Sequence, residues 1–152
     1  MKAKTSTPKK AAKKTTARKS WADKMEQDHS VVKKLDKDFA DMKAGSMMYI
    51  SNPKTVDAYI RNIPKGRAVA LKTMRQDLAL EHRADVTCPV TTGIFLRIVA
   101  EAAHEQLRQG KAVSKITPFW RVMDAKMPLA KKLTFGKKLI REQRKKEKLD
   151  LA

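Results

Sequence analysis

The stretch Thr117-Pro118-Phe119-Trp120-Arg121-Val122 places one of the chain's two tryptophans next to one of its four phenylalanines. Only 5% of the 152 residues are aromatic, so this pair concentrates ring surface at one point. Adjacent rings either fill a core or offer a stacking surface to a nucleic-acid base, where stacking is worth roughly 1–3 kcal/mol per base. We favour the core. Upstream, Ile63-Pro64-Lys65-Gly66 ends one helical pattern and opens the segment that leads to this stretch.

Apolar spacing predicts three helices around these two stretches. Val56, Tyr59, Ile60 and Ile63 recur at i, i+3, i+4 and i+7, after a start at Asn52-Pro53. A second helix is predicted over residues 71–83, with a turn through 84–89. Thr91 or Thr92 then caps a long helix to about Gln109, with Ile94, Phe95, Ile98, Val99, Ala102 and Ala103 on its core face and Arg97, Glu101, His104 and Arg108 on an outer strip.

The flanking segments are less regular. Ser20 is a predicted N-cap, with Asp23 in the first turn. From Val31 to Met42 the spacing of Val31, Leu35, Phe39 and Met42 predicts a helix, and Met47–Ile50 an edge strand. Pro128 interrupts residues 123–129, which we expect to be a turn or wing. The final helix, from Lys137 to about Leu149, has so few apolar positions that it is open whether it folds without a partner.

The formal charge of +19 lies mostly at the two ends of the chain. Residues 1–20 hold eight basic residues and no acid, and residues 131–152 hold nine basic and three acidic ones. The 110 residues between them hold eighteen basic and thirteen acidic ones. Such a distribution attracts polyanions by releasing counterions, so we expect a nucleic-acid partner. Apart from Met1, residues 1–20 contain no large apolar side chain, and they are predicted to be a disordered basic tail.

The composition also removes several classes of function. A lone cysteine, Cys88, excludes an intramolecular disulfide and a cysteine-based metal site, and it fits a reducing cytoplasm. His29, His82 and His104 lack the spacing of metal ligands, so we expect no metal and no cofactor. No run reaches the roughly 18 apolar residues of a membrane span, and the basic N-terminus lacks the apolar core of a secretory signal.

Two helices joined by a turn and followed by a wing predict a mainly α fold with a small β wing, a winged helix–turn–helix. In that arrangement the second helix enters a groove of the duplex. The cations around the first helix would meet phosphates, namely Lys65, Arg67, Lys72 and Arg75. Thr91 and Thr92 would add donors at the start of the second helix, and Arg97 would reach a base edge or a phosphate.

The motifs Ile63-Pro64-x-Gly66 and Pro118-x-x-Arg121-Val122, with the following Gly136, resemble the C-terminal DNA-binding domain of the O6-alkylguanine-DNA alkyltransferases. The resemblance covers about residues 53–136. It is closest to an MGMT-like subset with an aromatic-Trp-Arg sequence and an extended segment like Cys88–Phe95. It implies that Arg121 joins the DNA contacts and that a pocket is formed by Leu71, Pro118, Phe119 and Trp120.

The resemblance also argues against alkyl transfer. The family's chemistry needs a thiolate activated by a histidine. Phe119 stands at the cysteine position, Trp120 at the histidine position, and Leu71 at that of the base-rotating tyrosine. The base-replacing arginine would fall near Gly93, with Arg97 as an alternative, and the Asn-Pro hinge is replaced by residues 109–114. We therefore predict a non-catalytic protein; a substitute role for Cys88 has no histidine to support it.

These observations divide the chain into a basic tail (1–20), a helical extension (21–50), the MGMT-like domain (51–136) and a basic C-terminal helix (137–152). The predicted function is duplex DNA binding through backbone contacts, in the cytoplasm and at the nucleoid. Two alternatives stay open. One is a sensor of alkylated bases that recruits DNA repair, and the other is an RNA- or ribosome-associated protein, because lysine-rich tails do not read the 2′-hydroxyl.

Overall fold

A computed structural model describes residues 19–150, and the predicted disordered tail of residues 1–20 lies outside this range except for Lys19 and Ser20. The elements are α2 (Trp21–Met25), β1 (Val31–Lys34), β2 (Met47–Ile50), α3 (Pro53–Arg61), α4 (Leu71–Glu81), β3 (Val86–Thr87), α5 (Pro89–Arg108), the 3₁₀ turns η2 (Val113–Lys115), η3 (Phe119–Arg121) and η4 (Pro128–Lys132), and α6 (Lys138–Lys146). The fold is mainly helical with one small sheet, as the sequence predicts.

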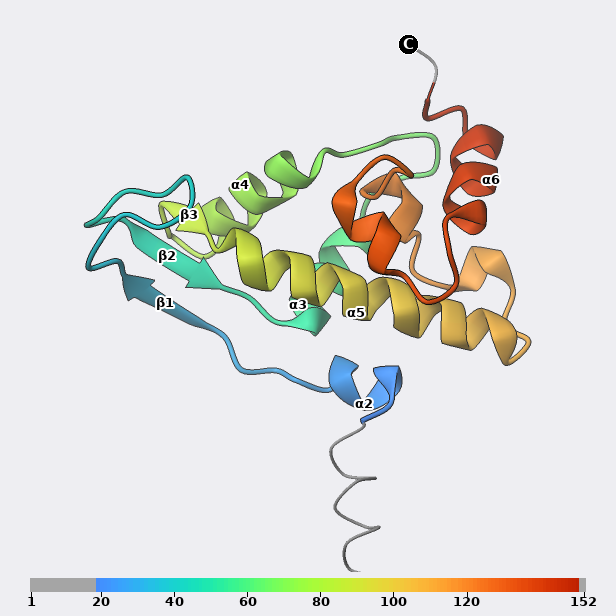
Figure 1. The fold of residues 1–152 in the computed structure, drawn as a ribbon, viewed down its shortest axis with the longest axis horizontal. Coiled ribbons are helices and arrows are strands. Elements are labelled where there is room, and N and C mark those ends of the chain that lie inside the picture. The colour runs from blue at the N-terminus through green and yellow to red at the C-terminus, as the bar shows by residue number, and fades with distance from the viewer. Residues whose placement is uncertain (1–18, 151–152) are drawn as a thin grey trace, which may run out of the picture.

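Helix α5 is the centre of the molecule, and it runs across the middle of Figure 1 between the sheet at one end and α6 at the other. It contacts α2, α3, η3 and η4. Leu96, Val99, Ala100 and Ala103 are almost completely buried on its inner faces. The alanines let neighbouring backbone approach closely, and Phe119 and Trp120 fill the space beside them as part of the same core.

Two helix starts match their sequence signals. Ser20 and Asp23 form the two hydrogen bonds of a capping box at α2. Asn52 caps α3 by accepting from Thr55 N at 2.8 Å, with Pro53 in the first helical position.

The predicted helix over residues 31–42 is wrong. Val31–Lys34 is strand β1, which pairs antiparallel with β2 in the register Val31↔Ile50, and β2 in turn pairs parallel with β3. Phe39 and Met42 exchange backbone hydrogen bonds across a tight turn at the tip of this hairpin. The supposed apolar face does not exist, because Phe39 is 44% exposed and Met42 is 2% exposed. The backbone pairing with β2, which follows after the hairpin loop, outweighs the helix-like spacing of the apolar residues.

The sheet is therefore built from the predicted helical extension (21–50) and β3, not from residues 123–129. The predicted wing there contains no strand; its residues lead into η4, which begins at Pro128. Since β2 pairs with β3 and α2 packs on α5, residues 21–50 belong to the same packed unit as the rest of the described chain.

The N-cap of helix α5 lies three residues before the first of the two predicted caps, Thr91 and Thr92. Cys88 is the N-cap residue and Pro89 the first helical residue, a position where proline loses no hydrogen bond. Thr92 is buried, and its hydroxyl donates to Cys88 O at 2.6 Å. The predicted faces shift accordingly: Ile94 is 51% exposed, and Glu101, predicted on the outer strip, is 2% exposed.

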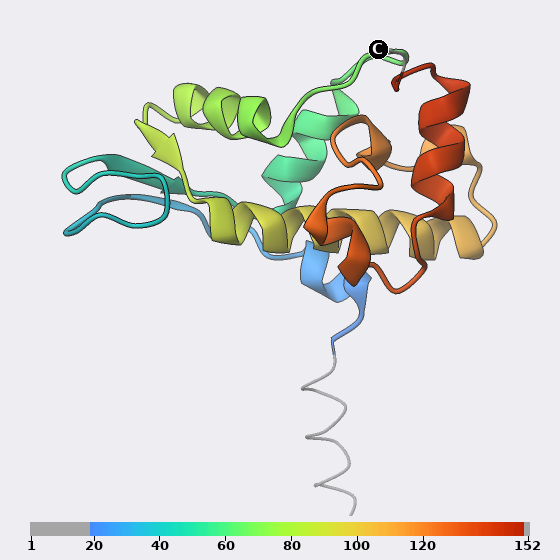
Figure 2. The same ribbon diagram turned by 45° about the horizontal axis from the view of Figure 1, so that its top comes forward.

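Helix α6 is shorter than predicted and is held largely by polar contacts. Ile140 is fully buried, and Arg144 is buried beside it. The Arg144 guanidinium donates to the carbonyl oxygens of Trp120 (2.7 Å) and Met123 (3.3 Å), and to Asp150. These bonds fix a helix whose apolar face is thin. Figure 2 shows α6 standing against the segment that contains η3.

Candidate nucleic-acid interface

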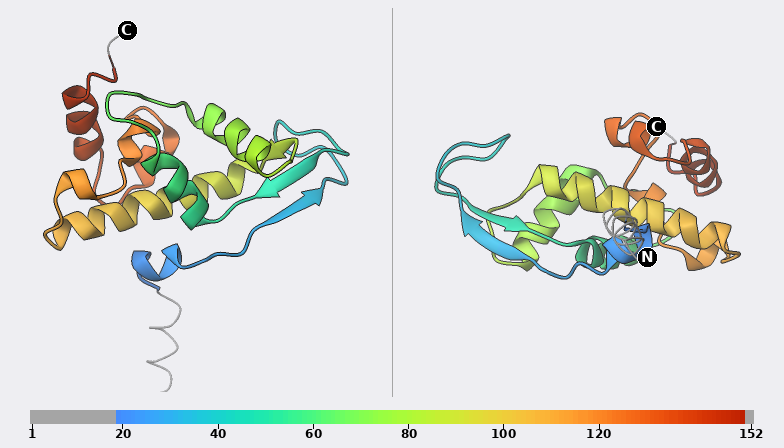
Figure 3. Two further views of the ribbon diagram at one scale, coloured as in Figure 1. Left: turned by 180° about the vertical axis from the view of Figure 1, so that it is seen from behind. Right: turned by 60° about the horizontal axis from the view of Figure 1, so that its bottom comes forward.

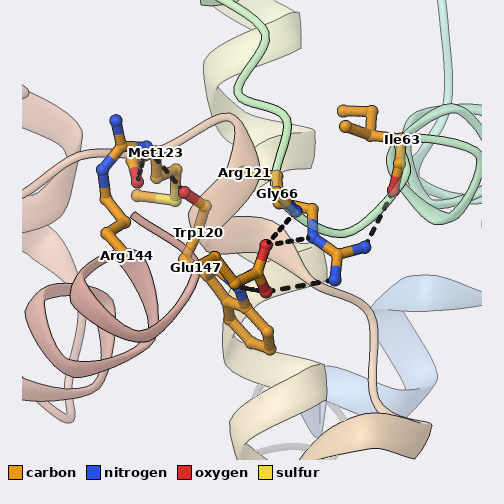
Figure 4. Close-up of polar contacts among 7 residues, drawn as sticks. All are labelled: Ile63, Gly66, Trp120, Arg121, Met123, Arg144 and Glu147. Carbon is orange, nitrogen blue, oxygen red and sulfur yellow. Dashed lines mark hydrogen bonds and ion pairs between the residues drawn. The ribbon is translucent and has the colours of Figure 1, made fainter. Parts of the chain in front are cut away.

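Glu147, just beyond α6, joins the two motifs that the sequence singles out. Its carboxylate accepts hydrogen bonds from Gly66 N (3.0 Å), Trp120 Nε1 (2.8 Å), and Arg121 Nε and Nη2 (2.9 and 3.1 Å), while Arg121 Nη1 donates to Ile63 O (2.8 Å) (Figure 4). We call these five residues the Glu147 cluster. Gly66 has φ +86°, the left-handed region that favours glycine, and this conformation aims its N–H at the carboxylate.

The two charged side chains of the cluster are largely buried and are paired with each other. The Glu147 and Arg121 side chains are 5% and 14% exposed. Burial by itself raises the pKa of Glu147, but the hydrogen bonds from Arg121, Trp120 and Gly66 outweigh it, so the pKa lies below its ordinary value. Nothing in the sequence pattern singled out Glu147. Its only signal is an acid within a run of lysines.

The cluster brings two basic segments together. Gly66 lies between Lys65 and Arg67 in the α3–α4 loop, and Glu147 lies among the lysines at the end of α6, so the 3.0 Å bond makes these segments neighbours. Figures 1 and 2 show the loop beside α6. The shared basic surface consists of the exposed side chains of Lys65, Arg67, Lys145, Lys146 and Lys148. Within residues 19–150, none of the five is paired with a carboxylate within 4.0 Å.

Lys72 and Arg75, predicted together as phosphate contacts, differ in their surroundings. Lys72 is exposed, without an ion pair in the described part of the chain. The Arg75 side chain is 15% exposed; it binds Asp41 (3.2 and 3.3 Å) and Thr87 O (3.0 and 3.1 Å). These bonds tie α4 to the hairpin and to β3. The same guanidinium lowers the pKa of Asp41.

The predicted contacts on α5 are also largely occupied within the protein. Thr92 is buried, and the Thr91 hydroxyl is buried without a hydrogen-bond partner. The Arg97 side chain is 33% exposed and lies 3.7 Å from Glu101, with its guanidinium carbon 5.3 Å from the centre of the Trp21 ring system. Arg121, in the Glu147 cluster, uses its donors inside the protein. The exposed predicted contacts are thus Lys65, Arg67 and Lys72.

The four predicted pocket residues do not enclose one common pocket: Pro118 and Trp120 line the hollow described below, and Leu71 and Phe119 do not. Phe119 is 0% and Trp120 2% exposed, Pro118 is buried and Leu71 half-buried. The Phe119 ring meets the Trp120 and Phe135 rings edge to face, at centroid distances of 5.3 and 5.8 Å. This geometry agrees with the core alternative. A hollow of about 390 Å³ does lie on the outer side of Trp120, lined by Arg61, Lys65, Arg121 and Glu147 among others.

The cysteine and two of the histidines pack against neighbouring side chains. Cys88 is buried in a small cluster with Met42 and Met48. His82 stacks on Tyr49 and His104 on Phe135. Residues 19–150 contain no group of three or more potential ligands that could hold a metal ion. No helix in that range is both long and apolar enough to cross a membrane.

Comparison with known proteins gives no match to a family model, to a curated protein sequence or to a solved structure.

Proposed function

We propose that this protein is a non-catalytic DNA-binding protein of the alkyltransferase-like, winged helix–turn–helix type, which binds duplex phosphates through its basic surface and Lys72. One observation carries the proposal. In the Glu147 cluster one buried carboxylate binds the Ile-Pro-x-Gly loop to the end of α6. The exposed cations of the basic surface beside it have no carboxylate partner in the described chain. Unpaired lysines and arginines gathered on one surface are the electrostatic requirement for binding a polyanion.

The helix–turn–helix part of the proposal rests on α4 and α5. They follow one another with only β3 between them, and Lys72 lies exposed in the first turn of α4. In proteins of this type the first helix crosses the backbone, which suits Lys72, and the second helix enters a groove. The resemblance of the Ile63-Pro64-x-Gly66 motif to the alkyltransferases supports the same orientation. The protein would then be found with chromosomal DNA.

The test is duplex binding by fluorescence anisotropy at several salt concentrations. The variant Lys65→Glu/Arg67→Glu should weaken binding to every duplex sequence and reduce the slope of log affinity against log salt by about 1–2. The matched control is Lys33→Glu/Lys34→Glu on β1, where two exposed lysines undergo the same change in charge. Equal losses in both variants would mean that net charge acts alone and that the basic surface is not the interface.

Damage sensing is tested with paired duplexes that contain O6-methylguanine or guanine. We expect equal affinity, because Phe119 and Trp120 are packed in the core and cannot receive an extruded base without unfolding their surroundings. A preference of tenfold or more, about 1.4 kcal/mol, would contradict this and favour the sensor alternative. An RNA duplex of the same sequence tests the other alternative: tighter binding to RNA at equal salt would replace DNA as the proposed partner.

A further inference from the structure

A groove separate from the basic surface lies between α2, the first half of α5 and η4. Its volume is about 740 Å³. Trp21, Val90, Ile94 and Leu129 provide its apolar lining. Val90 and Ile94 are 53% and 51% exposed, although both belong to the central helix of the fold. An unpartnered apolar strip of this kind marks an interaction surface.

The rim of the groove is positively charged. Lys19, Lys24, Arg97 and Lys132 line it, and none of the described lining residues is acidic. Lys24 Nζ lies 4.3 Å and the Arg97 guanidinium carbon 5.3 Å from the centre of the Trp21 ring system, so cations already contact the indole. With its aromatic ring engaged in this way and its other apolar residues aliphatic, the groove is poorly suited to stacking a nucleic-acid base. It suits an apolar anchor flanked by carboxylates.

The same chain carries such an anchor at the tip of its hairpin. Phe39 is 44% exposed, and Asp36, Asp38 and Asp41 surround it in the sequence. Residues 36–41 contain these three acids and a single lysine, an acidic segment in a chain of charge +19. The Asp38 and Asp41 side chains are 66% and 61% exposed, although each already has a cation nearby. Lys43 lies 3.9 Å from Asp38, and Arg75 of α4 binds Asp41. The tip therefore offers an exposed aromatic ring, together with the exposed carboxylates of Asp36 and Asp38, to an apolar groove with a cationic rim.

The hairpin leaves Phe39 exposed although its tip is anchored to the rest of the protein. Met42 is buried against Met48 and Cys88, and Asp41 binds Arg75 on α4. Backbone bonds from Leu35 N to Ser46 O and from Gly45 N to Leu35 O extend the β1–β2 pairing toward the tip. Phe39 and Met42 close the final turn, where Ala40 has φ +55°, a conformation that non-glycine residues adopt at some cost. The views of Figure 3 show this arm extending at the end of the molecule opposite α6.

We propose that the arm of one copy docks in the groove of a second copy, with Phe39 against Val90 and Ile94 and the carboxylates of Asp36 and Asp38 against the cationic rim. An aromatic anchor in an apolar groove supplies binding energy, and the flanking charges set the orientation. If two copies exchange arms reciprocally, two equal contacts close a twofold dimer; if they do not, the contact repeats head to tail.

The experiment is the molecular mass of the full chain in solution, measured over a range of protein concentrations. The wild type should associate, and Phe39→Ser and Ile94→Asp should each raise the dissociation constant about tenfold or more. Leu80→Ser is the matched control, since Leu80 is 79% exposed on α4 outside both arm and groove, and it should associate as the wild type does. Lys132→Glu, on the rim, provides a second groove variant should Ile94→Asp disturb α5.

Mixing gives the decisive result. The Phe39→Ser chain keeps its groove and the Ile94→Asp chain keeps its arm, so an equimolar mixture should recover association that neither shows alone. A wild type that is monomeric at every concentration would overturn the proposal and leave the groove to a different acidic partner. Unchanged association of Phe39→Ser would overturn it as well. Because the readout is mass without DNA, its failure is distinct from failure of the proposed DNA binding.

Discussion

Trp120 donates its indole N–H to Glu147, 27 residues later in the chain, at 2.8 Å. Both side chains are buried, and the same carboxylate also accepts a hydrogen bond from Arg121 Nε. In the resemblance to the alkyltransferases, Trp120 stands where a catalytic histidine would be. Here its ring N–H donates a structural hydrogen bond. An indole nitrogen can only donate, so it cannot act as a general base.

The first prediction concerns this cluster. Glu147→Ala should destabilise the protein by about 3 kcal/mol, because it leaves the buried Arg121 guanidinium without its carboxylate. Glu142→Ala on the same helix is the control. Its carboxylate is 52% exposed and 3.9 Å from Lys138, so its loss should cost about 0.5 kcal/mol or less. Chemical denaturation measures both; equal, small losses would show that the cluster contributes little.

The second prediction is a pH dependence. The pKa of Glu147 is lower in the folded protein than its ordinary value of 4.5, so its stabilising effect is complete above that value and is lost as the pH falls below it. The stability difference between the wild type and Glu147→Gln should therefore be constant near neutral pH and shrink in acid. Free energies of unfolding at a series of pH values test this, and a difference that grows on acidification would have the wrong sign.

The third prediction separates the core from a reactive site at Phe119. Phe119→Ala should cost about 3–5 kcal/mol, since the ring is fully buried among Trp120 and Phe135. Phe119→Cys should be destabilised as well, and it should not accept an alkyl group from O6-methylguanine DNA, because no base activates the thiol. Leu80→Ala, at an exposed position, is the stability control. Mass spectrometry that detected methyl transfer to the new cysteine would contradict the prediction.

The fourth prediction distinguishes Lys72 from Arg75. Arg75→Glu should lower stability by about 2 kcal/mol, because it removes the bonds to Asp41 and Thr87 O and adds a carboxylate beside Asp41. Lys72→Glu should leave stability within about 0.5 kcal/mol and weaken duplex binding at moderate salt. Thermal melting and anisotropy together give the two readouts. Unchanged duplex affinity in Lys72→Glu would remove α4 from the proposed interface.

Local signals determined much of the helical structure. The i, i+3, i+4 spacing of Val56, Tyr59 and Ile60, with Asn52 as cap, placed α3 correctly, and the Ser20–Asp23 pair marked α2. Each of these signals acts within a few residues, and the hydrogen bonds of a helix have the same short range. The exposure of Lys65, Arg67 and Lys72 is likewise what their charge alone would suggest.

Tertiary structure decided the rest, because it rests on partners far apart in sequence. The 31–42 segment has spacing that fits a helix, but residues 31–34 pair with β2 as a strand and the rest forms the hairpin loop. Arg75 and Arg121 look like surface cations until Asp41 and Glu147 are brought to them. The sequence by itself thus determined where several helices begin and how much charge the chain carries. The contacts of Glu147 with Gly66, Trp120 and Arg121 determined which charges are neutralised inside the protein and which remain exposed.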